Sequence, residues 1–297
     1  MARKDHIDSL GATSLIIFSV LLGLNQALVK LVNVGFSPIF QAGLRSVCAF
    51  FLVLAAAVIL RRRLSISDGS LRAGIIAGLL FSFEFCLLFT ALEYTTVSRV
   101  SMLFYTQPFW VALAAHFLIP GEQLNKNRIV GLLLAIGGVV ILLVKPGDQL
   151  GPDAIIGDLM CILASMAWAA IALMPRKTAL GNSSPEMMLL YQLAISGIIL
   201  VAIAPLFGDP VRDLTPTIIG IFTFQVVVIV AFGFLLWFWA LSTYPASDVT
   251  SFGLLAPAFG VFFGWLIFDE EFTLVFVVAL VLISSGIVLI NRKPASA

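Results

Sequence analysis

Three long stretches of this 297-residue chain contain no charged residue: those between Asp213 and Asp248, between Asp248 and Asp269, and between Glu271 and Arg292. A bilayer core of about 30 Å is crossed by a helix of ~20 apolar residues. Only helices or closed barrels satisfy their backbone groups there, and these runs lack the alternation of a barrel strand. Over the whole chain 11% of residues are charged, against about 25% in a soluble domain. The sequence therefore predicts an all-α membrane protein.

Ten membrane-spanning helices are expected from the apolar runs. The least distinct boundary is that between the eighth and ninth spans, where Tyr244 and Pro245 supply the turn. The expected ranges are 11–32, 38–60, 71–92, 96–118, 127–144, 154–174, 185–206, 216–240, 246–268 and 272–290.

The distribution of lysine and arginine predicts the orientation, because loops rich in these residues stay in the cytoplasm. If the N-terminus is cytoplasmic, only Lys145 and Arg212 of the 17 basic residues lie in outer loops. Lys30, Arg45 and Arg99 lie within spans, and all the other basic residues lie in cytoplasmic segments. We therefore expect ten transmembrane helices with both the N- and the C-terminus in the cytoplasm.

The chain contains an internal repeat. The segment "PFWVALAAHFLIPGE" begins at Pro108, and "PAFGVFFGWLIFDEE" begins 149 positions later at Pro257. Upstream, "ALEYTTVSRVSMLFYTQP" aligns with "ALSTYPASDVTSFGLLAP" without a gap. The repeat predicts two five-helix halves, residues 1–147 and 148–297, and an odd number of spans inverts the second half. Inverted repeats are common in secondary transporters that work by alternating access, although duplication also builds a stable bundle without transport.

Pro108 and Pro257 lie inside their predicted helices. Proline removes a backbone hydrogen bond and clashes with the carbonyl four residues earlier, so each predicts a helix kink. Kinks at matching positions in two halves indicate a central binding site. The alternative is an ordinary packing kink.

These features resemble the EamA-type family of the drug/metabolite transporter superfamily. The resemblance rests on the two proline segments, the glycine-bearing spans "GLLLAIGGVVILL" and "LVLISSGIVLI", Arg45, and the first-span segment "LGLNQALVK". Leu22 stands where the family usually has tryptophan, whereas the second half has Trp168. The resemblance implies a multi-pass carrier of the bacterial inner membrane that exports amino acids or related metabolites. It also implies a cavity between the halves, with the fifth and tenth spans at the periphery.

Two charged residues within spans are the main candidates for substrate binding, because charge in a membrane costs ~2.5–3.5 kcal/mol on insertion scales. Glu84 lies deep in the third span. It could be the counter-charge for a substrate amine, a proton carrier, or the partner of Arg45 or Arg99 in a structural ion pair. Arg45 is suited to bind a carboxylate, but it could also extend to the lipid headgroups. For Lys30 and Arg99 we expect the same extension, or a pair with Asp158.

Aromatic and amide side chains are further candidates for the cavity wall. The alternative for the tyrosine and tryptophan residues is an interfacial belt. The candidates are Tyr105, Gln107, Trp168, Tyr191, Gln192 and Trp237. Two G-x-x-x-G pairs, Gly74/Gly78 and Gly260/Gly264, are expected to be internal packing seams rather than oligomer contacts.

Other functions find less support in the sequence. The three cysteines have no C-x-x-C spacing, so we expect no metal site, disulfide or cofactor. A net charge of +1 does not favour nucleic-acid binding. An intramembrane enzyme would need a nucleophile with a base, or paired acids, and a scaffold or sensor would usually bring a soluble domain. We expect a monomer or weak homodimer in the lipid bilayer that transports a small molecule, with protons as a candidate coupling ion. Drug-like or lipid-like cargo is the alternative.

Overall fold

The computed structural model describes residues 7–119, 124, 126–144, 153–244, 252–271 and 273–291. Within these ranges the chain is helical and has no strand. Its only β-type pairing there is one isolated bridge between Phe36 and Val211. The predicted all-α class is therefore confirmed.

Six helices are each long and apolar enough to cross a bilayer. They coincide with the first, second, third, fifth, sixth and seventh predicted spans. Their bounds are α1 Ser9–Val32, α2 Pro38–Ile59, α3 Leu71–Tyr94, α6 Lys126–Val144, α7 Ala154–Lys177 and α8 Pro185–Ile203. The chain is thus a multi-pass membrane protein, and the count of ten spans stays a prediction.

The other predicted spans are divided into shorter helices. The fourth consists of α4 Val97–Phe104 and α5 Gln107–Leu118. The eighth consists of α9 Pro216–Phe224, the π-helical segment η3 Gln225–Phe232 and α10 Gly233–Thr243. The ninth contains the 3₁₀ turn η4 Gly253–Leu255 and α12 Ala256–Phe268, and the tenth is α13 Leu274–Asn291. Residues 245–251, with most of the predicted turn after the eighth span, lie outside the described ranges.

Several helix starts follow directly from the sequence. A serine or threonine followed by proline begins α2, α8 and α9. The hydroxyl of Ser37, Ser184 or Thr215 accepts a hydrogen bond from the amide three residues later, at 3.2–3.4 Å. This is the N-cap geometry, and proline suits the first helical position because no donor is required there.

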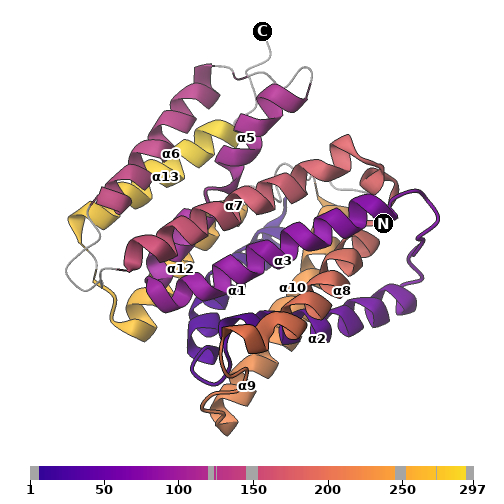
Figure 1. The fold of residues 1–297 in the computed structure, drawn as a ribbon. Helices are drawn as coiled ribbons and strands as arrows, with labels where there is room; N and C mark the ends of the chain where they lie inside the picture. The colour runs from indigo at the N-terminus through magenta and orange to yellow at the C-terminus, as the bar shows by residue number, and fades with distance from the viewer. Residues whose placement is uncertain are drawn as a thin grey trace.

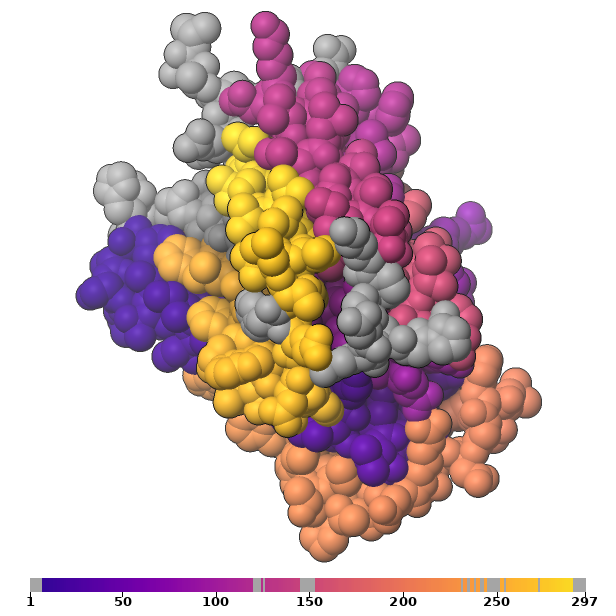
Figure 2. All heavy atoms as spheres, turned by 90° about the vertical axis from the view of Figure 1, so that its left-hand side faces the viewer, coloured from indigo at the N-terminus to yellow at the C-terminus, as the bar shows by residue number. Residues whose placement is uncertain are grey.

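The helices pack in pairs that join the two halves of the sequence (Figure 1). Helix α2 packs along α8, α3 along α7, and α1 along α12. The largest hydrophobic cluster includes buried residues of α2, α3, α4, α7 and α8. Helices α6 and α13 lie along each other at one edge of the bundle, as Figure 2 shows from that side. These are the predicted fifth and tenth spans, which were expected at the periphery.

Glycines bring helices close together at internal seams. Gly78 of α3 lies against Ile195 of α8, where an added Cβ would stand 2.6 Å from the Ile195 Cβ atom. Gly260 and Gly264 of α12 lie against Ser101 and Ser98 of α4. The prediction that both G-x-x-x-G pairs serve internal packing is therefore confirmed.

Two adjacent glycines of α6 provide a test of this packing. We expect Gly138→Ala to lower the thermal stability of the purified protein, because the new Cβ would stand 2.9 Å from the carbonyl oxygen of Ala279 and 2.7 Å from Ile283 on α13. Overpacking of this kind costs about 1–3 kcal/mol. Gly137→Ala is the matched control, since nothing lies within 4 Å of that position. Thermal unfolding in detergent measures the difference. Equal melting temperatures would contradict a close α6–α13 seam.

Candidate functional site

A partly open cavity of about 730 Å³ lies between the two halves of the sequence. Its wall contains residues from helices of both halves. Several sequence-predicted residues are brought together there: Arg45, Tyr105, Gln107, Pro108, Trp168, Trp237 and Pro257.

Two interrupted helices form part of the wall. Helix α4 ends at Phe104, and α5 begins at Gln107 with Pro108 in its first turn. Tyr105 lies in the link between them and contributes to the cavity wall. Pro257 likewise lies in the first turn of α12, directly after the 3₁₀ turn η4. Each proline therefore stands at a helix break beside the cavity.

The aromatic candidates Trp168 and Trp237 lie on helices from the second half. Trp168 of α7 is 39% exposed, which leaves its ring accessible from the cavity. Trp237 of α10 stacks on Phe18 of α1, with 5.1 Å between the ring centroids and 25° between the ring planes. The packing across the two helices fixes the orientation of this indole.

Arg45 of α2 is 8% exposed and lies in the cavity wall. Its Nη1 atom donates a hydrogen bond of 3.0 Å to Oδ1 of Asn25 on α1. The guanidinium carbon lies 4.8 Å from the ring centroids of both Phe85 and Phe89 on α3. Aromatic faces attract a cation in this geometry. The cation is thus held in place without a carboxylate within ion-pair distance among the described residues.

Glu84 lies near this arginine but not in the cavity wall. It is 1% exposed, and its Oε2 atom has no hydrogen-bond partner in the described part of the chain. The alternative of a direct ion pair with Arg45 or Arg99 is not observed, although Glu84 and Arg45 interact electrostatically over a longer distance. Its neighbour Phe85 lines the cavity instead, because adjacent helical residues point about 100° apart.

Tyr191 and Gln192 are also not brought to the cavity. Helix α8 presents Leu189 and Leu193, one turn apart, to the wall. Tyr191 instead faces α3, where its hydroxyl lies 3.1 Å from that of Ser70. The Gln192 amide donates to the carbonyl of Met188 on its own helix, at 3.3 Å.

Sequence reasoning missed four polar residues of the wall, namely Asn25, Ser46, Arg128 and Arg176. Asn25 had a signal, since it and Gln26 are adjacent amides inside the first apolar span. The two arginines lie near helix ends, at the start of α6 and the end of α7. Charges at such positions are usual at a membrane boundary. Arg176 is exposed, so the described part of the cavity wall reaches the surface at this end of the bundle.

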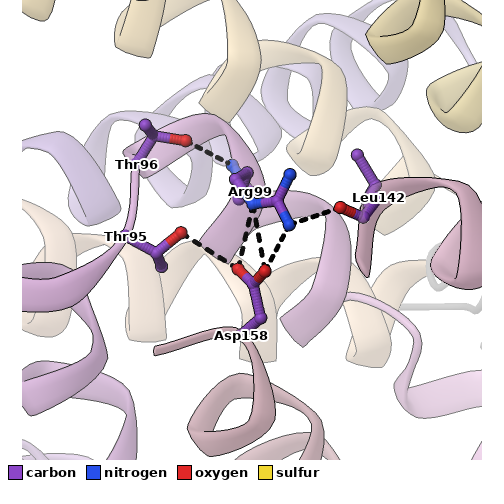
Figure 3. Close-up of polar contacts among 5 residues, drawn as sticks. All are labelled: Thr95, Thr96, Arg99, Leu142 and Asp158. Atoms are coloured by element: carbon purple, nitrogen blue, oxygen red, sulfur yellow. Dashed lines mark hydrogen bonds and ion pairs between the residues drawn. The ribbon is translucent and has the colours of Figure 1, made fainter. Parts of the chain in front are cut away.

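The opposite end of the bundle is closed by a buried ion pair (Figure 3). Arg99 of α4 and Asp158 of α7 are 3% and 1% exposed, and the Nε atom lies 3.0 and 3.1 Å from the two carboxylate oxygens. Thr95 donates to Asp158 at 2.9 Å, and Arg99 donates to the Leu142 carbonyl of α6 at 2.6 Å. The expected pairing of Arg99 with Asp158 is confirmed, and it joins three helices.

A second carboxylate reinforces the same closed end. Glu270, which follows α12, accepts hydrogen bonds from the Val97 and Ser98 amides at 2.7 and 2.9 Å. These amides begin α4, and a carboxylate is favoured at a helix N-terminus. Lys30 of α1 donates to the carbonyl of Thr95 at 2.8 Å. Polar groups from α1, α4, α6, α7 and the end of α12 therefore meet at one end of the bundle.

The comparison with protein families gives two matches to a single family model. The model of the EamA-like transporter family matches residues 9–144 and again residues 155–292.

Among the described residues, no three histidine, cysteine or acidic side chains are grouped so that they could hold a metal ion.

Individual relatives agree with this match. The chain is 26% identical to the uncharacterized transporter YoaV of Bacillus subtilis (strain 168), over 84% of this chain and 86% of the relative. It is 24% identical to a probable amino-acid metabolite efflux pump of Salmonella typhimurium (strain LT2), over 97% and 94%. One crystal structure shares the fold, with a TM-score of 0.66 and 18% identity, over 93% of this chain and 95% of the other. On these grounds the chain belongs to the EamA-like transporter family.

Proposed function

We propose that this protein is a secondary transporter that exports small metabolites, amino acids or related compounds, by alternating access. One observation carries the proposal: the central cavity is open at the Arg176 end and closed at the Arg99–Asp158 end. A carrier in one of its two states has this shape. Membership of a transporter family favours the same function, and the name of the Salmonella relative supports the proposed substrate class.

The proposed mechanism uses residues 1–147 and 148–297 as inverted halves that exchange conformations. Two loop contacts at opposite ends of α2 support this arrangement. At one end, the amide of Ser37 donates to the Pro210 carbonyl at 2.9 Å. At the other, the Ser184 hydroxyl donates to the Arg63 carbonyl at 2.8 Å. Ser37 and Ser184 occupy matching positions in the two halves, and so do Arg63 and Pro210. Exchanging the halves therefore turns the first contact into the second.

A pair of side-chain contacts supports the same exchange. Thr95 donates to Asp158 at the start of α7, and Tyr244 donates to Asp8 at the start of α1, with distances of 2.9 and 2.5 Å. Thr95 and Tyr244 are related by the 149-residue offset of the repeat. The contact is thus made once at each end of the bundle.

We propose that the helix breaks at Pro108 and Pro257 are the bending points of this motion. Each lies in the cavity wall. A break that already lacks regular hydrogen bonds bends at a lower cost than an intact helix.

The basic residues suggest the orientation. With both termini in the cytoplasm of a bacterium, the Arg128 and Arg176 end faces inward, and the described state is inward-open. Ten spans in the inner membrane, in a monomer or weak homodimer, complete the proposal. Substrate contacts are assigned to Arg45, Tyr105, Gln107, Trp168 and Trp237. Glu84 is proposed as a proton carrier behind the wall.

Exchange in proteoliposomes tests the function. We expect saturable counterflow of one class of labelled amino acids or related metabolites, because a carrier with a single alternating site exchanges internal for external substrate. Addition of a pH gradient tests protons as the coupling ion, and Glu84→Gln should then abolish the response to the gradient. The matched control is Glu93→Gln, which changes a partly exposed acid near the end of the same helix. Correctly folded protein without exchange of any compound would contradict the proposal.

The alternating cycle also predicts how the closed end behaves. That end must open, so Arg99 and Asp158 must separate in the other state. We expect Asp158→Asn to favour that state, because it removes the charge from a buried pair. The reporter is Cys161, one turn further along α7 and 0% exposed. In a Cys48→Ala, Cys86→Ala background, the rate of its labelling by a membrane-impermeant maleimide should rise about tenfold. A change of that size corresponds to the free energy of one lost charged hydrogen bond.

The control for this experiment is Asp153→Asn on the same helix. Asp153 is exposed and makes no capping hydrogen bond. Lower stability of Asp158→Asn without faster labelling would show that the pair only holds the helices together.

A further inference from the structure

The charged side chains of the cavity wall all have the same sign. The described residues of the wall include Arg45, Arg128 and Arg176, and none of them is acidic. A site that binds an amine or the ammonium group of an amino acid is expected to offer a carboxylate as the counter-charge, and the described wall offers aromatic rings but no carboxylate. The buried positive charge of Arg45 in this wall instead favours an anion.

The Arg45 side chain has N–H donors that make no hydrogen bond within the described part of the chain. A guanidinium has five N–H donors, and that of Arg45 makes one hydrogen bond, to Asn25, in the described part of the chain. The residue is more than nine-tenths buried, so water contacts only a small part of it. The rings of Phe85 and Phe89 contact the guanidinium but accept no strong hydrogen bond. A carboxylate in the cavity would satisfy two of the unused donors at once.

Glu84, the acid that interacts electrostatically with Arg45, does not bind these unused donors. Glu84 is outside ion-pair distance of Arg45, and its side chain is buried behind the wall. It therefore neither neutralises Arg45 by direct contact nor faces a bound substrate.

Apart from the arginines, Asn25, Ser46, Tyr105 and Gln107, the described wall is apolar or aromatic. Aromatic rings of Phe81, Phe85, Phe104 and Trp168 line it together with leucine and isoleucine side chains. A volume of about 730 Å³ is within the range of sites for drug-sized ligands. The wall thus complements an apolar or aromatic body attached to a single anionic group.

We propose that the substrate class is an apolar or aromatic carboxylate, bound through its carboxylate to Arg45, and that an amino group is not required for recognition. This inference rests on the proposed function, because it treats the cavity as the transport site. It narrows the cargo from amino acids and related metabolites to those that Arg45 selects by their negative charge.

The test is a competition between three compounds with the same ring. Binding of tritiated 3-phenylpropanoate to purified protein is measured by scintillation proximity. It is displaced with unlabelled 3-phenylpropanoate, phenylalanine or phenethylamine, which carry a carboxylate, both groups and an amine respectively. We expect the carboxylate to displace the probe at least as well as phenylalanine, and the amine not to displace it. Displacement by phenethylamine at equal concentration, or no binding of 3-phenylpropanoate, would overturn the inference.

Variants locate the binding group. Arg45→Gln should weaken binding of the carboxylate about tenfold to a hundredfold, the effect of losing a charged hydrogen bond. Arg45→Lys should give a smaller loss, since it keeps the charge without the planar fork. Arg63→Gln, an exposed arginine outside the cavity, is the matched control and should bind normally. Unchanged binding by folded Arg45→Gln protein would also overturn the assignment.

The Glu84→Gln variant tests whether the carboxylate of Glu84 takes part in substrate binding. It should make the carboxylate bind more tightly, because a negative charge that interacts with Arg45 is removed. Weaker binding would place Glu84 in the site and contradict the inference. Counterflow with the same compounds keeps the two proposals apart. Carboxylate binding without exchange would contradict transport alone, and exchange restricted to amines would contradict the carboxylate class alone.

Discussion

Inside a membrane no water is available for an interrupted backbone or a bare charge, so the protein must supply every partner itself. This constraint is most severe around α4, where one predicted span is divided. The Thr106 hydroxyl donates to the Leu103 carbonyl beside the break, at 2.6 Å. At the other end of α4, Glu270 accepts hydrogen bonds from the first amides. Arg99, on the same short helix, forms an ion pair with Asp158. The break beside the cavity is thus stabilised by groups that also close one end of it.

The two buried arginines illustrate how the same residue type serves different ends. Each carries an insertion cost of ~2.5–3.5 kcal/mol. Arg99 recovers it through a carboxylate on α7 and a carbonyl on α6. Arg45 recovers part of it, through one amide oxygen and two ring faces. The first arrangement is complete within the protein, whereas the second leaves N–H donors to which we propose that a substrate carboxylate binds. The exposed fractions of Arg45 and Arg99 do not distinguish the two arrangements, but the groups that each guanidinium contacts do.

The sequence was sufficient to predict the helical class and six of the long spans, because hydrophobic length leaves few alternatives. For Arg99 and Lys30 it predicted either extension to the headgroups or a pair with Asp158, and the structure shows the pair for Arg99. The sequence also indicated Arg45, Tyr105 and Trp168, which the structure gathers at one cavity. It could not place Glu84, Tyr191 and Gln192, because a side chain's direction changes by about 100° per helical residue. Whether a helix bends or breaks at proline depends on which neighbour satisfies the freed carbonyls. The π-helical segment Gln225–Phe232 has no sequence signal of its own.

The contact between α6 and α13 has a structural consequence. At Gly131 and Gly286 the backbone of one helix lies against that of the other, and at Gly138 it lies against the Ile283 side chain and the Ala279 carbonyl of α13. Small residues let two helix backbones approach this closely. This pair contributes only Arg128, Ile287 and Ile290 to the cavity wall. The α6–α13 contact therefore joins the two halves of the sequence largely apart from the cavity wall, so most of the residues that hold the halves together here are not those that line the cavity.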